Sequence, residues 1–193
     1  MGKIFFTSDL HFGHYNVIFK YDKRPFATIE EHDKGIIENW NKRVSKEDTV
    51  YILGDISWHK DEETANLLRQ LNGNKILIKG NHDRIGPEMK KCFSYIKDYD
   101  EIKINNRMII LSHYPILFYR NHLHDTLMLY GHLHNSEEDS IMNEVKELLK
   151  SKNSPHKMMN VGCMHTDYVP ISYEEICEIL DKESWFHKVS MVY

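Results

Sequence analysis

Short apolar runs in this sequence repeatedly end in residues that can bind a metal ion. The clearest example is the turn Gly80-Asn81-His82-Asp83, which follows an apolar run at 75–78 that reads as a buried strand. Asn81 can offer an amide oxygen to a metal, His82 can move a proton, and Asp83 can hold the imidazole in one tautomer. Taken alone, the tetrapeptide is equally consistent with a turn-forming asparagine beside a surface histidine.

The same arrangement recurs at four other places. Apolar strands are predicted over 3–8, 49–53, 108–112 and 127–130, and each is followed by Asp or His. These polar residues are Asp9, His11, Asp55, His113, His132 and His134. Asp9 and His11 are two residues apart, a spacing that on a strand puts both side chains on the same side. Such side chains are costly to bury together unless an ion or a hydrogen-bond network compensates them, so the sequence indicates a metal site.

Helical patterns alternate with these strands, which indicates an α/β fold in one domain spanning 1–193. Helices are predicted over 15–21, from the Thr28/Glu31 capping box to 44, over 60–71, from 87 through Ile96, over 140–151, and from the Ser172/Glu175 capping box to about 181. A hairpin around Asn105-Asn106 and strands at 158–161 and 189–193 complete the prediction.

Composition excludes several other classes of protein. With 193 residues, 41% hydrophobic and 28% charged, the chain is typical of a compact soluble protein. No run approaches the roughly 18 apolar residues needed to span a bilayer, and the first residues lack a signal-peptide pattern, so a cytoplasmic location is expected. The three cysteines are widely spaced and form no CxxC pair, which argues against disulfides or a thiolate metal site.

Charge and histidine content narrow the function further. A net charge of -4 and a pI near 6.3 argue against a domain that holds long nucleic acid mainly through nonspecific phosphate contacts, although a local basic patch stays open. The 13 histidines are the unusual component, because several stand beside Asp, Asn or Gly at the ends of apolar runs. This pattern again favours a metal-binding protein.

Taken together and in order, these segments resemble the calcineurin-like metallophosphoesterase superfamily. The matching blocks are Asp9-Leu10-His11, Gly54-Asp55, Gly80-Asn81-His82-Asp83, Ser112-His113 and Gly131-His132-Leu133-His134. The resemblance runs from residue 5 to about 134, and the opening at 8–14 looks like a small bacterial or phage branch. It implies a four-layer αββα sandwich of two mixed β-sheets flanked by helices.

The resemblance also implies a ligand set for two metal ions. Asp9, His11, Asp55 and His134 would bind one ion, and Asp55, Asn81, His113 and His132 would bind the other. Asp55 would bridge the two. Carboxylate, amide and imidazole ligands suit Mn²⁺, Fe, Co²⁺, Ni²⁺ or Zn²⁺ better than Ca²⁺, and we take manganese as the first choice.

The mechanism implied by the resemblance is metal-assisted hydrolysis of a phosphate ester. A metal-bridging hydroxide would attack phosphorus in line with the leaving oxygen, His82 would protonate the leaving group, and Asp83 would orient the ring of His82. We therefore expect a phosphoric ester hydrolase acting on a small phosphorylated molecule, for which a nucleotide is one candidate. A phosphodiesterase is favoured over a phosphatase.

Two alternative functions stay open from the sequence. One is a nuclease acting on nucleic-acid ends, which the acidic balance disfavours. The other is a catalytically silent, metal-bearing interaction platform, because a fold does not by itself establish activity. The oligomeric state and the roles of five residues are also undetermined; these residues are His14, Arg24, Arg84, His122 and His124. Trp58 and His59 follow Asp55 closely and are candidates for the rim of the site.

Overall fold

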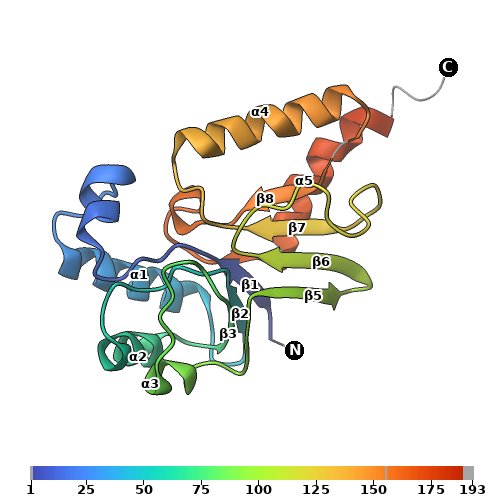
Figure 1. Cartoon of the computed structure of the whole chain (residues 1–193). Helices are drawn as coiled ribbons and strands as arrows, with labels where there is room; N and C mark the ends of the chain where they lie inside the picture. Colours follow the sequence, from blue (N-terminus) through green and yellow to red (C-terminus); the bar gives the residue numbers. More distant parts are fainter. Residues whose placement is uncertain (1, 155, 189–193) are drawn as a thin grey trace.

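Two mixed β-sheets form the centre of the computed structural model, which describes residues 2–154 and 156–188 (Figure 1). The five-stranded sheet has the order β4-β3-β2-β1-β9, and the four-stranded sheet has the order β5-β6-β7-β8. The first sheet contains β1 (Ile4–Thr7), β2 (Thr49–Ile52), β3 (Asn74–Ile78), β4 (Ile96–Lys97) and β9 (Ile171–Ser172). The second contains β5 (Tyr99–Ile104), β6 (Arg107–Ser112), β7 (Leu127–Tyr130) and β8 (Met158–Asn160).

Helices lie on both sides of the paired sheets (Figure 1). They are α1 (Ile29–Arg43), α2 (Asp61–Gln70), α3 (Pro87–Lys90), α4 (Glu137–Ser151) and α5 (Tyr173–Lys188). The first three cover the outer face of the five-stranded sheet, α4 lies on the other side of the molecule, and α5 packs beside β1, β8 and β9. The predicted four-layer arrangement of two mixed sheets flanked by helices is thereby confirmed.

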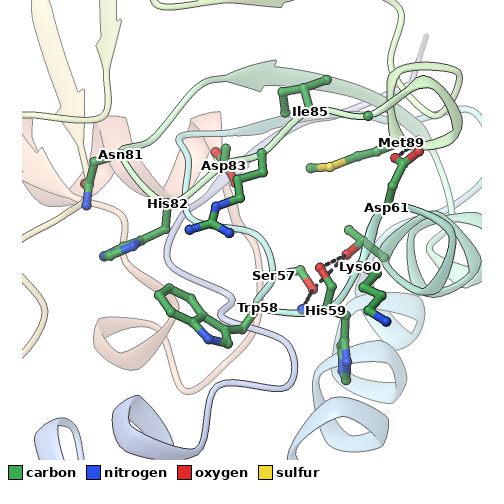
Figure 2. A pocket seen from close by; sticks show the side chains of 13 residues that line it. Ser57, Trp58, His59, Lys60, Asp61, Asn81, His82, Asp83, Ile85 and Met89 are labelled. Atoms are coloured by element: carbon green, nitrogen blue, oxygen red, sulfur yellow. Dashed lines mark hydrogen bonds between the residues drawn. The ribbon is translucent and has the colours of Figure 1, made fainter.

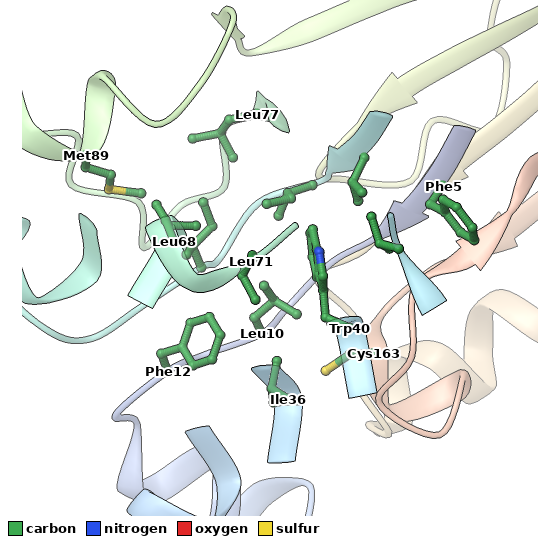
Figure 3. Close-up of a cluster of buried hydrophobic side chains, with 14 residues drawn as sticks. Phe5, Leu10, Phe12, Ile36, Trp40, Leu68, Leu71, Leu77, Met89 and Cys163 are labelled. Carbon is green, nitrogen blue, oxygen red and sulfur yellow. The ribbon is translucent and has the colours of Figure 1, made fainter. Parts of the chain in front are cut away.

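Alternation along the strands separates the core into layers. In β1, Phe5 faces the cluster formed with α1 and α2, whereas Phe6 faces the core between the two sheets. Figure 3 shows the first cluster, in which Trp40 of α1 is fully buried and donates its indole N–H to the carbonyl of Asn72 at 2.9 Å. Residues from both sheets meet in the second cluster, so the sheets share one interior.

Several predicted boundaries differ from the structure. Ile96 lies in β4 rather than in the helix predicted from 87, which ends at Lys90. The helix predicted from 140 begins at Glu137, because the Ser136 side chain caps it by accepting from the backbone N–H of Glu138. Residues 17–21 form a single π-helical turn within the helix predicted over 15–21. The strand predicted at 189–193 lies outside the described residues.

The helix predicted from the Ser172/Glu175 capping box begins as expected. The Ser172 hydroxyl accepts from the backbone N–H of Glu175, and the Glu175 carboxylate accepts from the backbone N–H of Ser172 at 2.9 Å. Within residues 2–154 and 156–188, no helix combines the length and the apolar character that crossing a membrane requires. The extent of the domain over 1–193 and the cytoplasmic location stay predictions.

Strand direction decides where the polar side chains meet. β1, β2 and β3 are parallel neighbours in one sheet, and β6, β7 and β8 are parallel neighbours in the other. The loops that follow these strands therefore lie at the carboxyl ends of the strands in each sheet. Functional groups of open α/β sheets are commonly found there.

Candidate metal centre

Two groups of potential metal ligands form where these loops meet. Asp9, His11, Asp55 and His134 each place one ligand atom within 4.8 Å of the others. Asp55, His113 and His132 form the second group under the same criterion. The amide oxygen of Asn81 lies 2.9 Å from Nε2 of His113, which brings Asn81 to the second group. The structure thus gathers all seven predicted ligands, with Asp55 in both groups.

The imidazole nitrogens face the carboxylates at distances suited to a shared cation. In the first group, Nε2 of His11 lies 3.1 Å from Nε2 of His134. Nε2 of His134 lies 3.5 Å from Asp9 Oδ1, and Nε2 of His11 lies 3.7 Å from Asp55 Oδ2. In the second group, Nε2 of His113 lies 3.5 Å from the same oxygen of Asp55. Such mixed nitrogen and oxygen donors, converging on one point, fit a divalent metal ion.

Both groups combine ligands from both sheets. Asp9, His11, Asp55 and Asn81 follow strands of the five-stranded sheet, whereas His113, His132 and His134 follow β6 and β7. Their approach requires glycine at the strand ends. A Cβ on Gly54, whose φ is +92°, would lie 2.6 Å from the Cα of Gly80, and a Cβ on Gly80 would lie 2.3 Å from Asp55 Oδ1. The Gly-Asp and Gly-Asn-His-Asp patterns therefore have a steric reason.

Five of the seven candidate ligands have a left-handed backbone. The φ angles are +57° for Asp9, +51° for His11, +54° for Asp55, +72° for His132 and +50° for His134. A non-glycine residue in this region costs on the order of 1–3 kcal/mol and persists where the surrounding structure enforces it. Other turns of the described chain also contain non-glycine residues with positive φ, but these five meet at one cluster of side chains, as strained residues at functional sites do.

Outer hydrogen bonds direct the histidine rings toward the site. Nδ1 of His113 lies 2.7 Å from the carbonyl oxygen of Leu53, so this nitrogen donates and Nε2 is left to face Asp55. Nδ1 of His134 lies 2.9 and 3.0 Å from the two carboxylate oxygens of Asp22, which fixes the same tautomer. Asp22 was not recognised from the sequence, because no motif marks it.

Arg24 is buried beneath the site instead of facing solvent. The residue is 4% exposed, and its guanidinium donates to the carbonyl oxygens of Asp9 and Leu10 and to the Asp22 carboxylate. Through these hydrogen bonds Arg24 fixes the backbone at Asp9 and Leu10. It also fixes Asp22, the carboxylate that contacts His134. The role of Arg24, undetermined from the sequence, is therefore to support the ligand-bearing loops rather than to face a substrate.

A chain of polar contacts continues from Arg24 into α1. Nη1 of Arg24 lies 2.9 Å from Nε2 of His32, and Nδ1 of His32 lies 2.8 Å from Asp33 Oδ1. The second oxygen of Asp33 lies 3.0 Å from Nε2 of His59. The chain therefore links the first ligand group to the segment after β2.

Electrostatics at the first group favour a cation. Burial raises the pKa of the Asp9 carboxyl above its usual value, because no solvent compensates the negative charge. Burial and the neighbouring His134 lower the pKa of His11 well below its usual value, so this imidazole is neutral near pH 7. Burial opposes ionisation of Asp55 as well, but contact with His113 holds its pKa below the usual value. Metal binding requires neutral imidazoles and ionised carboxylates. Burial opposes protonation of His134, but contact with Asp22 and the charge of Asp9 raise its pKa, so a bound cation would have to displace a proton there.

His82 and Asp83 have different surroundings. His82 is exposed at the rim, and its backbone N–H donates to Asp55 Oδ1 at 2.9 Å. Asp83 is buried, and its carboxylate accepts from the backbone N–H groups of Asp55, Ile56 and Gly80 at 2.8–3.0 Å. Asp83 was predicted to orient the ring of His82. In the structure its carboxylate instead bonds to backbone N–H groups and so joins the two loops that carry Asp55 and His82.

A cavity of about 830 Å³ adjoins the site on the side of His82 (Figure 2). Asn81 and His82 lie at one end, and Trp58, His59 and Arg84 also line it. Trp58 and His59, the candidates for the rim of the site, thus line the cavity that adjoins it. Arg84, whose role was undetermined from the sequence, lines the cavity too.

The other histidines of undetermined role divide into two kinds. Nδ1 of His14 lies 3.3 Å from Nδ1 of His11, so His14 adjoins the first ligand group. His122 stacks on His156 with ring centroids 4.6 Å apart, and His124 is exposed. Neither His122 nor His124 is among the residues of the two ligand groups.

Replacing Asp22 with asparagine is expected to weaken metal binding by about 10- to 100-fold, the usual effect of removing an outer partner of a metal-binding histidine. Asparagine keeps the size of the side chain but removes the charge that fixes the His134 tautomer. Titration of metal-free protein against a chelator of known affinity measures the change, with the exposed Asp98→Asn as the matched control. Unchanged metal affinity in Asp22→Asn would exclude this role.

Comparisons with known proteins agree with the geometry. The model of the family described as calcineurin-like phosphoesterase matches residues 2–184. An uncharacterised protein of Methanocaldococcus jannaschii is 34% identical over 184 residues, covering 94% of this chain and 93% of that protein. The gene 66 protein of Mycobacterium phage D29 is 31% identical over 176 residues, covering 77% of this chain and 86% of the phage protein. A crystal structure of a protein of unknown function from Aquifex aeolicus has a TM-score of 0.70 at 29% identity, covering 93% of this chain and 100% of that chain.

Proposed function

Because this chain belongs to the calcineurin-like phosphoesterase family, which comprises hydrolases of phosphate esters, we propose that it is a metal-dependent phosphodiesterase with a small phosphorylated substrate such as a nucleotide. The observation that carries the proposal is the pair of ligand groups that share Asp55. A phosphate placed across them would contact both, and His82 stands at the rim beside it.

The ligand set supports two divalent transition-metal ions, with manganese as the first choice. Asp9, His11 and His134 would hold one ion together with Asp55, and Asn81, His113 and His132 would hold the second with the same carboxylate. Ions bound there supply activated water and positive charge for the phosphate oxygens. The protein's own contribution is to fix the ligands: the left-handed backbone and the outer contacts of His113 and His134 set their directions before substrate arrives.

The exposed position of His82 at the rim supports a role for this side chain at the leaving group. Its backbone N–H is fixed on Asp55, while its imidazole is exposed and lies 5.9 Å from the ring of His11, centroid to centroid. An imidazole N–H at this position can give its proton to the leaving oxygen as the ester bond breaks. Asp83 supports this step indirectly, because it ties the His82 loop to the Asp55 loop.

The cavity beside His82 favours a diester over a monoester. A diester carries a second organic substituent, which needs room beside the phosphate, and a volume of about 830 Å³ offers it. Small-molecule sites commonly have volumes of about 300–1,000 Å³.

Metal reconstitution tests the proposed activity. Metal-free protein is supplied separately with Mn²⁺, Ni²⁺ or Zn²⁺ and assayed with bis-p-nitrophenyl phosphate and with p-nitrophenyl phosphate. We expect turnover only in the presence of metal and a higher kcat/KM for the diester, because its second substituent occupies the cavity. A higher kcat/KM for the monoester would show that the protein is a phosphatase and not the proposed phosphodiesterase. Two bound metals without turnover of either ester would favour an interaction platform.

A further inference from the structure

Trp58 presents an open aromatic surface inside the cavity beside His82 (Figure 2). One face of its indole lies against the imidazole of His14, with ring centroids 4.2 Å apart and planes within 6°. The ring of His82 lies 5.1 Å away at a tilt of 60°. Despite these two neighbours, Trp58 is 51% exposed, so its uncovered surface is open to a further planar ring.

The position of Trp58 is fixed by the same loops that carry the ligand groups. The backbone N–H of Trp58 donates to the carbonyl of Phe12 at 2.8 Å, and Phe12 N–H donates to the carbonyl of Ile56 at 2.9 Å. These bonds hold the segment after β2 alongside the segment after β1. His14, which stacks on Trp58, contacts the candidate ligand His11 through the two Nδ1 atoms at 3.3 Å. The indole is therefore held in a defined orientation beside the proposed phosphate position.

The cavity also offers a positive charge. Arg84 follows Asp83 directly, lines the cavity and is exposed. Among residues 2–154 and 156–188, no hydrogen bond or ion pair engages its guanidinium. This group is thus open to the acceptor atoms of a bound molecule, to which arginine presents several donors in one plane.

We propose that this cavity is a nucleoside subsite, in which a nucleobase stacks on the uncovered surface of Trp58 while the adjoining phosphate lies on the two ligand groups. The proposal rests on the proposed phosphodiesterase function and narrows its substrate class to esters that carry a nucleobase. Three observations support it: the half-exposed indole, its rigid backing by His14, and a cavity that begins at Asn81 and His82. Any nucleobase can stack on tryptophan. The subsite therefore selects for the presence of a base and does not distinguish one base from another.

Binding of adenosine 5′-monophosphate, ribose 5-phosphate and inorganic phosphate to the metal-loaded protein tests the subsite by calorimetry. The first two differ at C1 of the ribose, where the nucleotide carries a base and ribose 5-phosphate a hydroxyl group. We expect the nucleotide to bind the wild-type protein at least about 10-fold more tightly than ribose 5-phosphate, since stacking of one base on an aromatic side chain has this order of effect. Trp58→Ala should remove that difference and leave the affinities for ribose 5-phosphate and phosphate unchanged. Trp58→Phe should restore most of it.

The exposed Phe118, which is not among the residues lining the cavity, provides the matched control in Phe118→Ala. Equal binding of the nucleotide and ribose 5-phosphate to the wild-type protein would overturn the subsite, as would an equal loss of both affinities in Trp58→Ala. Turnover of bis-p-nitrophenyl phosphate by the same wild-type preparation separates the two proposals. Diester turnover without a preference for the base would overturn the subsite alone, whereas absence of turnover would count against the phosphodiesterase itself.

Discussion

Asp55→Asn is expected to lose metal binding and nearly all hydrolysis of bis-p-nitrophenyl phosphate. Asp55 is the carboxylate that belongs to both ligand groups, and one of its oxygens lies 3.5 Å from Nε2 of His113 and 3.7 Å from Nε2 of His11. Removing an outer partner of a metal ligand already costs about 10- to 100-fold, so loss of a shared ligand should cost more than about 100-fold in turnover. Asparagine keeps the shape but removes the negative charge.

Metal content per chain and kcat/KM are measured together for Asp55→Asn, with Asp98→Asn as the control for a surface charge change. The buried Asp55 also accepts from the backbone N–H of His82, so circular dichroism of the variant establishes whether it folds. A folded Asp55→Asn protein with the wild-type metal content and rate would rule out the shared-ligand arrangement.

His82→Ala is expected to keep the metal and lose turnover according to the leaving group. His82 is exposed at the rim and belongs to neither ligand group, so its removal leaves the ligand set in place. A general acid contributes about 10²- to 10⁴-fold when the leaving group needs a proton. The loss should approach this range for a dinucleoside monophosphate, whose leaving group is an alkoxide, and should be small for a p-nitrophenyl ester.

Comparing the two substrates with the wild type and His82→Ala gives the leaving-group dependence directly. His124→Ala serves as the matched control, because His124 is an exposed histidine outside the ligand groups. Equal losses on both substrates would indicate that His82 positions substrate rather than donating a proton, and no loss on the dinucleoside ester would exclude its participation.

The ligand residues could be predicted because their signal is local in the sequence. Each stands directly after an apolar strand, and parallel neighbours bring such strand ends together. The glycines before Asp55 and Asn81 also indicate that the two loops meet. The loops approach too closely for a Cβ at Gly54 or Gly80. The two-sheet architecture followed from the resemblance in these blocks rather than from periodicity.

The supporting residues could not be predicted in the same way. Asp22 acts through a contact with His134, which is 112 residues away in the chain. The sequence around Asp22 contains no motif that indicates this partner. The sequence did contain a signal for the polar pair in α1. The helical spacing puts His32 and Asp33 on the same buried face as Ile36 and Trp40. Polar residues at core positions of a helix require buried partners, and those partners lead to Arg24.

Asp83 and the shortest strands show two further limits. Adjacency of Asp83 to His82 suggested a contact between the two side chains, but the peptide turn sends the carboxylate inward to backbone N–H groups. β4 and β9 contain two residues each, so neither is long enough to show an alternating pattern. Both are strands through their pairing with β3 and β1.

Because each ligand group takes donors from both sheets, a bound ion would join the two halves of the sandwich as a removable crosslink. The unfolded chain has no such arrangement, so a bound metal would add to the free energy of unfolding by about 1.4 kcal/mol for each tenfold rise in its concentration above the dissociation constant. A cell short of the metal would then hold a chain that opens more often and is degraded sooner. The abundance of this protein would follow metal supply as well as synthesis.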